Sequence, residues 1–417
     1  MNNLGSLIFL ASVLLFTTFL NWYVFQAVKT LTSNLDSDKI RNSINVGYWL
    51  IFSGISLWVI LTFIGIFSAG EISATRQTAL NVFLTVLVTQ LVIVLILFGE
   101  DIFRNLQAGF SLVANGSKDF TFPTRNAYVS TLAIAIAAFP FFSFIYGTTY
   151  GKYNFKVHKE VIYFENLPDA FDGFTITQLS DIHSGSLRDK EGVRKGVDLA
   201  VRQNSDLVVF TGDLVNHKAE EIDPFLEQFA EIKGKYGQFS ILGNHDYGDY
   251  ISWPSKSDKE QNLENLKAKH AEMGFRLLLD EHVRIEKDGQ EITLIGVENW
   301  GVGFVKKGDL SKAMEGTPED GFKVLLSHDP SHWDEEVKKN QNPVHLTLSG
   351  HTHGMQFGIE TPLVRWSPVQ YRYPNWAGLA EEKGRFLYVN RGFGFHAFSG
   401  RVGIWPEITV IELRKAN

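Results

Sequence analysis

The first 150 residues contain four long stretches without Asp, Glu, Lys or Arg, and these constrain the fold more than any other feature. The stretches run over 1–28, 42–70, 77–99 and 126–151. A helix of about 20 apolar residues is long enough to cross the roughly 30 Å hydrocarbon core of a bilayer. We therefore predict four transmembrane helices, at about 4–28, 46–68, 78–98 and 127–147. Buried helices of a soluble domain are the alternative, but four within 150 residues would leave too little polar surface.

Charge divides the chain at the same place. Residues 1–150 carry seven Lys or Arg and six Asp or Glu, so 72 of the 85 charged residues and all twelve His lie beyond position 150. We place a domain boundary there, with a four-helix transmembrane region at 1–150 and a second domain at 151–417. The net charge of -7 does not fit nucleic-acid binding, which usually requires a basic face. Because the chain has no Cys, oxygen and imidazole must hold any metal.

Basic residues between the predicted helices indicate an orientation. The first and third connections together contain six of them: Lys29, Lys39, Arg41, Arg104, Lys118 and Arg125. The opposite side has four, namely Arg76, Lys152, Lys156 and Lys159. Basic loops tend to stay cytoplasmic, so we predict a multi-pass protein of the cell membrane whose second domain is extracytoplasmic. The first stretch has no basic residue ahead of it, which argues against a cleaved signal peptide.

Beyond position 150 the pattern changes to short β-rich runs separated by amphipathic segments. We predict strands at 174–179, 207–210, 239–242, 292–297, 323–326, 345–348, 386–389 and 408–413. Helices are predicted between the early strands, at 189–203, 220–233 and 259–273. Alternation of this kind is typical of a layered α/β sandwich.

Polar motifs follow five of these strands within two or three residues. They are Ser180-Asp181-Ile182-His183, Gly212-Asp213-Leu214, Gly243-Asn244-His245-Asp246, Ser327-His328-Asp329 and Gly350-His351-Thr352-His353-Gly354. Loops at the carboxyl ends of strands in α/β sheets meet at one place, so we expect these motifs to converge. A single His or Gly-Asp after a strand is usually a structural residue, but five motifs of metal-ligand type together indicate a metal site.

The residue types suit a pair of divalent ions. Asp213 is the natural bridging carboxylate, because an anionic group with two oxygens can bind two cations about 3.5–4 Å apart. The other predicted ligands are Asp181, His183, Asn244, His328, His351 and His353. Such a pair would activate a bridging hydroxide for attack on a phosphorus atom. We assign proton donation or phosphate-oxygen stabilisation to His245, with Asp246 orienting its ring.

These motifs resemble those of the calcineurin-like metallophosphoesterases. The match includes Asp-x-His, Gly-Asp, Gly-Asn-His-Asp, His and Gly-His-x-His in this order, and it covers roughly residues 155–413. The membrane-anchored group is the most similar, because Asn166-Leu167-Pro168, Phe171-Asp172-Gly173 and the tail Tyr388-Val389-Asn390-Arg391-Gly392-Phe393-Gly394 also match it. Met355 departs from the pattern, since many relatives have a second Gly there.

The resemblance implies a four-layer αββα sandwich and two metal sites that share Asp213. One metal would take Asp181, His183, Asp213 and His353, and the other Asp213, Asn244, His328 and His351. His245 would be the catalytic histidine. The family uses Mn, Fe, Zn, Ni or Mg, so the ligands do not identify the metal.

The expected partners are a phosphoester and the lipid bilayer. His217, Arg188 and His396 are predicted substrate contacts. The segment 355–406 is rich in aromatic and basic residues, which suits a lipid-like phosphoester at a membrane surface or, alternatively, a packed β-layer with solvated arginines. Two other functions stay open: a non-catalytic metal-binding interaction module, and a transporter with an accessory domain. Predicted spans free of Asp, Glu, Lys, Arg and His disfavour the transporter.

Overall fold

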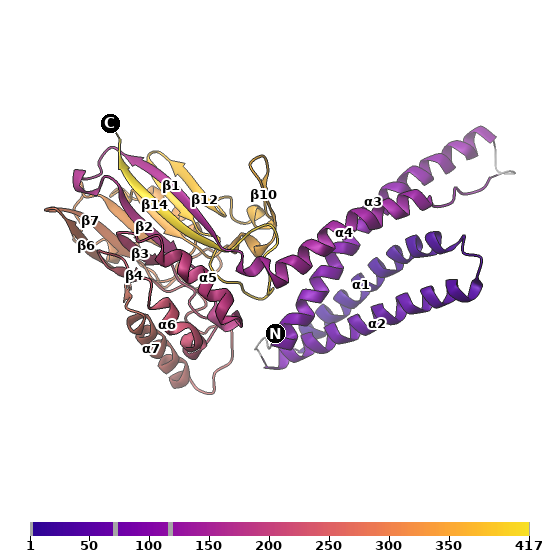
Figure 1. The fold of residues 1–417 in the computed structure, drawn as a ribbon, viewed down its shortest axis with the longest axis horizontal. Helices are drawn as coiled ribbons and strands as arrows, with labels where there is room; N and C mark the ends of the chain where they lie inside the picture. Colours follow the sequence, from indigo (N-terminus) through magenta and orange to yellow (C-terminus); the bar gives the residue numbers. More distant parts are fainter. Residues whose placement is uncertain (1–2, 70–73, 116–119, 417) are drawn as a thin grey trace. The chain divides into compact units, whose positions relative to one another are not determined.

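The computed structural model describes residues 3–69, 74–115 and 120–416 (Figure 1). The chain divides into two compact units, Met1–Tyr146 and Gly147–Asn417. Each unit is built around its own core.

Four apolar helices form the N-terminal part, as the charge-free stretches predict. They are α1 (Asn3–Thr32), α2 (Asp38–Ala69), α3 (Ala74–Asn115) and α4 (Ala127–Thr149). All four are long and apolar enough to cross a membrane. Alanines such as Ala27, Ala133 and Ala137 are buried where α1, α3 and α4 pack, because small side chains let helix backbones approach closely. Large apolar side chains on the outer faces are exposed, as lipid-facing residues are.

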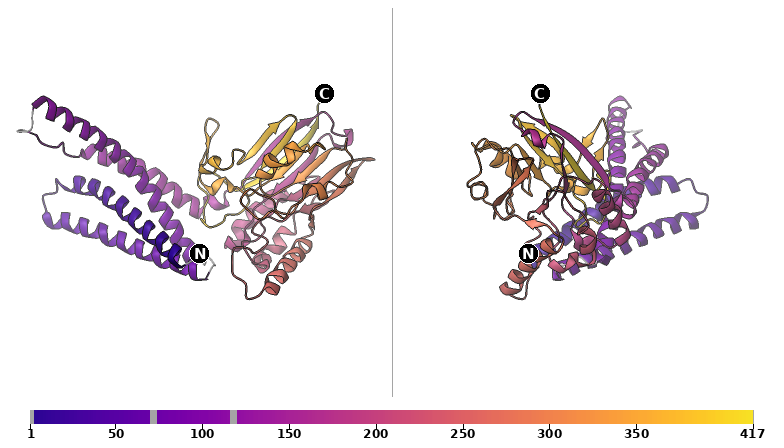
Figure 2. Two further views of the ribbon diagram at one scale, coloured as in Figure 1. Left: turned by 180° about the vertical axis from the view of Figure 1, so that it is seen from behind. Right: turned by 60° about the vertical axis from the view of Figure 1, so that its left-hand side comes forward.

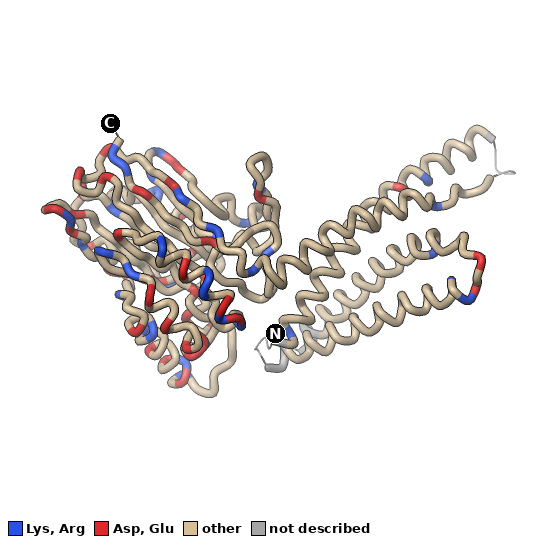
Figure 3. The backbone as a smooth tube through the Cα atoms, in the orientation of Figure 1, with Lys and Arg blue, Asp and Glu red and all other residues tan. Residues whose placement is uncertain are grey.

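The third helix is longer than predicted. It continues to Asn115 instead of ending near residue 98, and the continuation carries charged residues (Figure 3). Arg125 donates to Glu100 at 2.8 Å and to Asp101 at 2.6 and 2.7 Å. Because these charges are paired, the helix continues through them without leaving an isolated buried ion. The expectation of spans without ionisable residues holds for 78–98 but not for the whole of α3.

Two six-stranded mixed sheets form the body of the second unit. The first sheet has the order β1-β14-β2-β3-β4-β5 and the second β12-β13-β9-β8-β7-β6. Strands of the first sheet are β1 (Lys156–Phe164), β2 (Phe174–Leu179), β3 (Leu207–Phe210), β4 (Gln238–Ser240), β5 (Arg276–Leu277) and β14 (Glu407–Lys415). Those of the second are β6 (Glu281–Lys287), β7 (Gln290–Gly296), β8 (Lys323–Leu326), β9 (Leu346–Ser349), β12 (Gly378–Glu382) and β13 (Arg385–Val389). A separate hairpin pairs β10 (Ile359–Glu360) with β11 (Arg365–Trp366).

Three apolar cores define four layers, which confirms the predicted αββα sandwich (Figures 1 and 2). Between the sheets, Ile176 and Val209 of the first pack with Leu294 and Leu326 of the second. The outer face of the first sheet is covered by α5 (Lys190–Val201), α6 (Leu226–Phe229) and α7 (Lys256–Glu272), and that of the second by the short helices α8 (Leu310–Ala313) and α9 (Ser331–Glu335). Central strands such as β3 and β8 are buried along their whole length. The continuous apolar sequence of β3 predicts this burial, whereas β8 also buries Lys323 at its start.

The helix predicted at 220–233 is shorter than expected and is mostly a 3-10 helix. The segment 220–233 is a 3-10 helix, Ala219–Phe225, followed by the single turn of α6. Pro224 lies in the 3-10 segment and has no backbone N–H to donate, which disfavours a continuous α-helix. The sequence also failed to indicate β1 and β6, because charged residues alternate with their apolar ones.

Candidate metal centre

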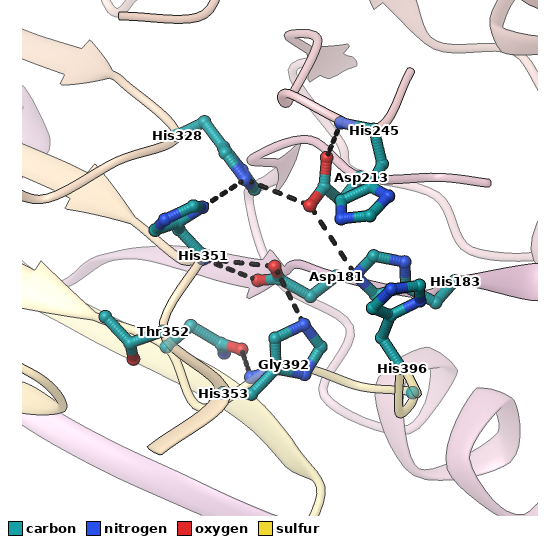
Figure 4. A network of polar contacts seen from close by, with 12 residues as sticks. Asp181, His183, Asp213, His245, His328, His351, Thr352, His353, Gly392 and His396 are labelled. Atoms are coloured by element: carbon teal, nitrogen blue, oxygen red, sulfur yellow. Dashed lines mark hydrogen bonds and ion pairs between the residues drawn. The ribbon is translucent and has the colours of Figure 1, made fainter. Parts of the chain in front are cut away.

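The polar motifs converge at one edge of the sandwich. Loops that follow β2, β3 and β4 come from the first sheet, and those that follow β8 and β9 come from the second. Figure 4 shows their side chains pointing toward one another between the two sheets. The sandwich thus brings together residues that lie up to 172 positions apart in the sequence, from Asp181 to His353.

Backbone conformation separates these residues from ordinary loop positions. Asp181, His183, Asp213, His351 and His353 all have positive φ, between 46° and 71°. The left-handed region is unfavourable for residues with a Cβ, and such residues gather where the surrounding structure forces a functional geometry. Five residues of this kind in one cluster therefore indicate a functional site independently of their chemistry.

The first group of side chains comprises Asp181, His183 and His353, whose ligand atoms lie within 4.8 Å of one another. Nε2 of His353 is 3.3 Å from Oδ1 of Asp181. Nε2 is buried and has no hydrogen-bond partner among the described residues. A buried polar atom without a partner carries a free-energy cost, which a metal ion at this position would remove.

The second group comprises Asp213, His328 and His351 within the same 4.8 Å limit. Nε2 of His328 lies 3.2 Å from Oδ2 of Asp213, and Nδ1 of His351 lies 3.3 Å from Nε2 of His328. Oδ1 of Asn244 is 2.9 Å from Nδ1 of His351, so the amide oxygen belongs to this group as well. The ring of His328 is held by its other nitrogen, Nδ1, which lies 2.7 Å from the carbonyl oxygen of Thr211.

Asp213 lies between the two groups. Its Oδ2 is 3.2 Å from Nε2 of His328 in the second group and 3.5 Å from Nε2 of His183 in the first. Its Oδ1 accepts the backbone N–H of His245 at 2.8 Å, which fixes the rotation of the carboxylate. A single carboxylate oxygen thus faces histidines from both groups, as a bridging ligand requires.

Burial and charge set the protonation of the site. Burial lowers the pKa of His183, His351 and His353, which favours the neutral imidazole that a metal ion binds. Burial disfavours the charged form of Asp213, but the imidazole of His328 outweighs it and holds the pKa of Asp213 well below its usual range. Burial also opposes protonation of His328, whereas Asp213 raises the pKa of His328 to about 10. The buried carboxylates therefore favour positive charge between the two groups.

Asp246 has a different position from the one predicted. Its Oδ2 accepts the backbone N–H groups of Asp213 at 2.9 Å and Gly243 at 2.8 Å, and its Oδ1 accepts that of Leu214 at 2.8 Å. The ring of His245 is instead held through Nδ1, 3.0 Å from the carbonyl oxygen of Asn216. The prediction that Asp246 orients His245 is wrong, because its carboxylate is fully used in joining the two loops.

Two of the three predicted substrate contacts lie beside His245. The ring of His396 is 4.4 Å from that of His245 and 4.8 Å from that of His183. The ring of His217 is 6.0 Å from that of His245. Arg188 is exposed at the end of the loop after β2, and its contact with substrate stays a prediction.

Asn216 is a site residue that the sequence did not reveal. Its Oδ1 lies 3.1 Å from Nδ1 of His183 and 3.3 Å from Nδ1 of His396, and its carbonyl oxygen holds His245. One residue thereby orients three imidazoles, as carboxylates and amides commonly do behind metal ligands. Its place three residues after Asp213, in the same loop, was the available signal.

The sequence also failed to identify the groups that hold the His351 loop. The hydroxyl of Tyr373 is 3.0 Å from Nε2 of His351 and donates to Asp329 at 3.2 Å. Arg401 is fully buried and donates to the carbonyl oxygen of His353 at 3.1 Å. Tyr373 and Arg401 both lie in the segment 355–406, so this segment helps to hold the loop of His351 and His353 in place.

A cavity adjoins Asn244. It has a volume of about 220 Å³ and is lined by Asn244, Tyr247, Asp249, Tyr250, Asn299, Gly303, Phe304 and Val305. The ring of Phe304 is also 4.8 Å from that of His351. The cavity therefore offers aromatic and amide groups beside the second group of side chains.

Two family models match the chain. The model described as "Probable Calcineurin-like phosphoesterase, transmembrane domain" matches residues 5–152, and the one described as "Calcineurin-like phosphoesterase" matches residues 174–355. The chain belongs to the calcineurin-like phosphoesterases that carry a transmembrane domain. This family supports a hydrolase in general and divalent metals as cofactors, which the grouped His and Asp side chains fit.

The descriptions of individual related proteins are consistent with this family. The "Uncharacterized metallophosphoesterase YkuE" of Bacillus subtilis is 29% identical over 258 residues, covering 60% of this chain and 82% of the relative. The "Transmembrane protein with metallophosphoesterase domain" of Danio rerio is 28% identical over 280 residues, covering 65% of this chain and 60% of that protein. With the four apolar helices, this second relative supports a membrane protein. The solved structure of Phosphopantetheinyl Hydrolase from Mycobacterium tuberculosis aligns with 12% identity and a TM-score of 0.32, covering 52% of this chain and 89% of that one.

Proposed function

We propose that this chain is a membrane-anchored phosphoesterase that uses two divalent metal ions to hydrolyse a phosphomonoester, a phosphodiester or a lipid-linked phosphoester. The observation that carries the proposal is the position of Asp213, whose Oδ2 faces a histidine from each of two ligand groups. One metal would be held by Asp181, His183, Asp213 and His353, and the other by Asp213, Asn244, His328 and His351. Divalent ions bound there would polarise the phosphoryl group and make bound water acidic.

The chain's own residues would do the remaining work. The Nδ1 of His245 is held by the carbonyl oxygen of Asn216, so Nε2 is the nitrogen left to meet a phosphate oxygen or to give a proton to the leaving group. The ring of His396 lies next to that of His245 and adds a second imidazole for the phosphate oxygens. The cavity beside Asn244 would take the organic part of the substrate.

Replacing Asp213 with Asn tests the shared carboxylate. We expect hydrolysis to be lost and bound metal to fall, because a neutral amide cannot bridge two cations as a carboxylate does. The matched control is Asp280→Asn, since Asp280 is also buried and also has positive φ, at 54°, but accepts amides outside the metal groups. Full activity with unchanged metal content in Asp213→Asn would contradict the two-metal proposal.

A non-catalytic binding module is the competing function. The two functions are separated by metal analysis of the purified full chain together with a panel of phosphomonoesters, phosphodiesters and lipid pyrophosphates. The proposal predicts turnover of at least one class that a chelator removes and a divalent metal restores. Bound metal without turnover of any class would favour the binding module.

We also propose that the phosphoesterase domain is extracytoplasmic. Support comes from the six basic residues in the first and third connections between the spans predicted from sequence, against four on the other side. Protease added to intact cells or spheroplasts should then cut the domain. Cleavage that requires lysis would place the domain in the cytoplasm.

A further inference from the structure

The hairpin β10–β11 presents an apolar tip to its surroundings. Leu363 is 95% exposed, and Val364 and Ile359 are about half exposed. Met355 and Tyr371, just before and after the hairpin, are also exposed. Figures 1 and 2 show the hairpin standing away from both sheets. Contiguous exposed apolar side chains usually mark a surface that contacts a partner or a membrane.

The tip has a defined conformation. Ile359 pairs with Trp366, and the turn closes where the N–H of Thr361 donates to the carbonyl oxygen of Val364 at 2.8 Å. The hydroxyl of Thr361 also accepts the N–H of Val364 at 3.0 Å. A rigid turn therefore holds Leu363 outward instead of letting it fold back onto the domain.

Contacts within the second unit connect this hairpin to the last turn of α4. The N–H of Arg401 donates to the carbonyl oxygen of Gly147, which lies in that turn, at 3.1 Å. The next residue, Val402, forms a β-bridge with Phe357, and the N–H of Gly358 donates to the carbonyl oxygen of Val402 at 2.9 Å. Hence the base of the hairpin is two backbone contacts away from Gly147, the first residue of the second unit.

Basic side chains accompany the apolar tip. Arg365 lies on the hairpin itself and Arg372 follows Tyr371, and both are exposed. Apolar and aromatic side chains flanked by Arg or Lys are typical of segments that enter the boundary between headgroups and acyl chains, because the basic groups stay with the phosphates. Five apolar side chains are also far fewer than the roughly 20–30 residues that each partner supplies to a stable protein interface.

The chain that follows the hairpin returns to the metal loop. The hydroxyl of Thr352 donates to the carbonyl oxygen of Trp376 at 2.6 Å. The hydroxyl of Tyr373 lies 3.0 Å from Nε2 of His351. A hairpin seated in a bilayer would thus bring the loop of His351 and His353 close to the level of the headgroups.

We propose that the β10–β11 hairpin inserts its tip into the surface of the bilayer that anchors the chain, so that the metal centre acts on phosphoesters carried by lipids. Action on lipid-borne phosphoesters rests on the proposed function. Insertion of the hairpin tip into the bilayer does not, and the two claims are tested by separate measurements.

Site-directed fluorescence tests the insertion. The chain has no Cys, so Leu363→Cys in the full-length protein can carry a single environment-sensitive label, with Val201→Cys as the control. Val201, the last residue of α5, is 39% exposed and distant in sequence from the hairpin. In phosphatidylcholine–phosphatidylglycerol vesicles, we expect the label at 363 to shift to the blue and to be quenched by brominated acyl chains, and the label at 201 to do neither. Equal emission and no quenching at 363 would overturn the insertion, and so would a blue shift without quenching, which indicates a protein contact.

Activity tests the substrate class. In the double variant Leu363→Asn/Val364→Asn, hydrolysis of a vesicle-borne phosphoester should fall at least about tenfold, since the apolar area that seats the tip is removed. Hydrolysis of a soluble p-nitrophenyl phosphodiester should stay within about twofold of wild type, as expected for exposed substitutions. Equal losses on both substrates would overturn the lipid assignment. Quenching at 363 in a protein that hydrolyses no phosphoester would keep the insertion and refute the proposed function.

Discussion

Arg401 should be among the most sensitive positions of the second unit. It is completely buried, and its guanidinium donates to backbone carbonyl oxygens of Gly394 at 3.0 Å, Arg391 at 2.6 Å, Gly392 at 3.0 Å and His353 at 3.1 Å. Burial lowers the pKa of Arg401 to about 9, so the side chain remains charged at neutral pH. The residue therefore ties the tail 391–394 to the metal loop through a single charged group.

The change Arg401→Met keeps most of the aliphatic stem and removes all of these donors. The carbonyl oxygen of Gly392 keeps the N–H of Glu407 at 3.0 Å, whereas those of Gly394, Arg391 and His353 lose the guanidinium. At about 1 kcal/mol for each buried acceptor left without this donor, the loss is about 3 kcal/mol. For a unit of this size, that corresponds to a melting temperature lower by about 6–12 °C.

Thermal unfolding of the full chain in detergent, followed by intrinsic Trp fluorescence, measures this loss. The control is Arg414→Met, because Arg414 is partly exposed and its ion pairs with Asp172 and Glu412 at the surface contribute little to stability. Metal affinity should fall in Arg401→Met, since the carbonyl oxygen of His353 loses the guanidinium that holds it, and should stay unchanged in Arg414→Met. A melting temperature for Arg401→Met within about 2 °C of wild type would refute the assignment of these hydrogen bonds as the support of the metal loop.

Two further predictions concern the same unit. In Gly350→Ala, the new Cβ would lie 1.9 Å from Oγ of Ser180 and 2.2 Å from Oδ2 of Asp181, so metal content and hydrolysis should both fall. The control is Gly109→Ala in α3, where a Cβ meets nothing within 4 Å and neither quantity should change. Normal metal binding by Gly350→Ala would contradict the close packing of Gly350 against Ser180 and Asp181. Burial opposes ionisation of Glu407, but the guanidinium of Arg391 at 2.6 Å outweighs it and lowers the pKa of Glu407 from 4.5 to about 2. Because the folded-state pKa is the lower one, this stabilisation, on the order of 3 kcal/mol, is present above about pH 4.5 and lost as the pH falls toward 2. Unfolding titrations should show that loss in wild type and a much smaller one in Glu407→Gln, and equal acid sensitivity of both would exclude Glu407 as its origin.

Much of the fold was predictable because its signals are local. Charge-free stretches identify the four long helices, and the strands β2, β3 and β8 match their predicted ranges. In β3, a continuous apolar run reflects burial on both faces. The end of α3 was not predictable from charge alone. Glu100 and Asp101 are compatible with a continuing helix because Arg125, which lies beyond it in the sequence, pairs with them.

The candidate ligands were predictable for a related reason. Each sits within a few residues of a strand end, so sequence order and strand position suffice to bring them together. Their backbone strain was not predictable, because nothing in the local sequence requires φ of 71° at His351 or 46° at His183. The assignment of individual ligands to two metals stays a proposal, and metal analysis of the variants tests it.

The groups that orient the imidazoles come from other loops, which explains why the prediction that Asp246 orients His245 was wrong. Asp246 lies in a turn that begins at His245, in which the N–H of Gly248 donates to the carbonyl oxygen of His245 at 3.1 Å. Its carboxylate accepts the backbone N–H groups of Asp213 and Leu214, 33 and 32 residues away in the sequence, while the carbonyl oxygen of Asn216 holds His245 from 29 residues away. Orientation in this site comes from the neighbouring loop and not from the adjacent residue. Groups that orient imidazoles in similar sites are therefore expected in the loop after a neighbouring strand of the same sheet.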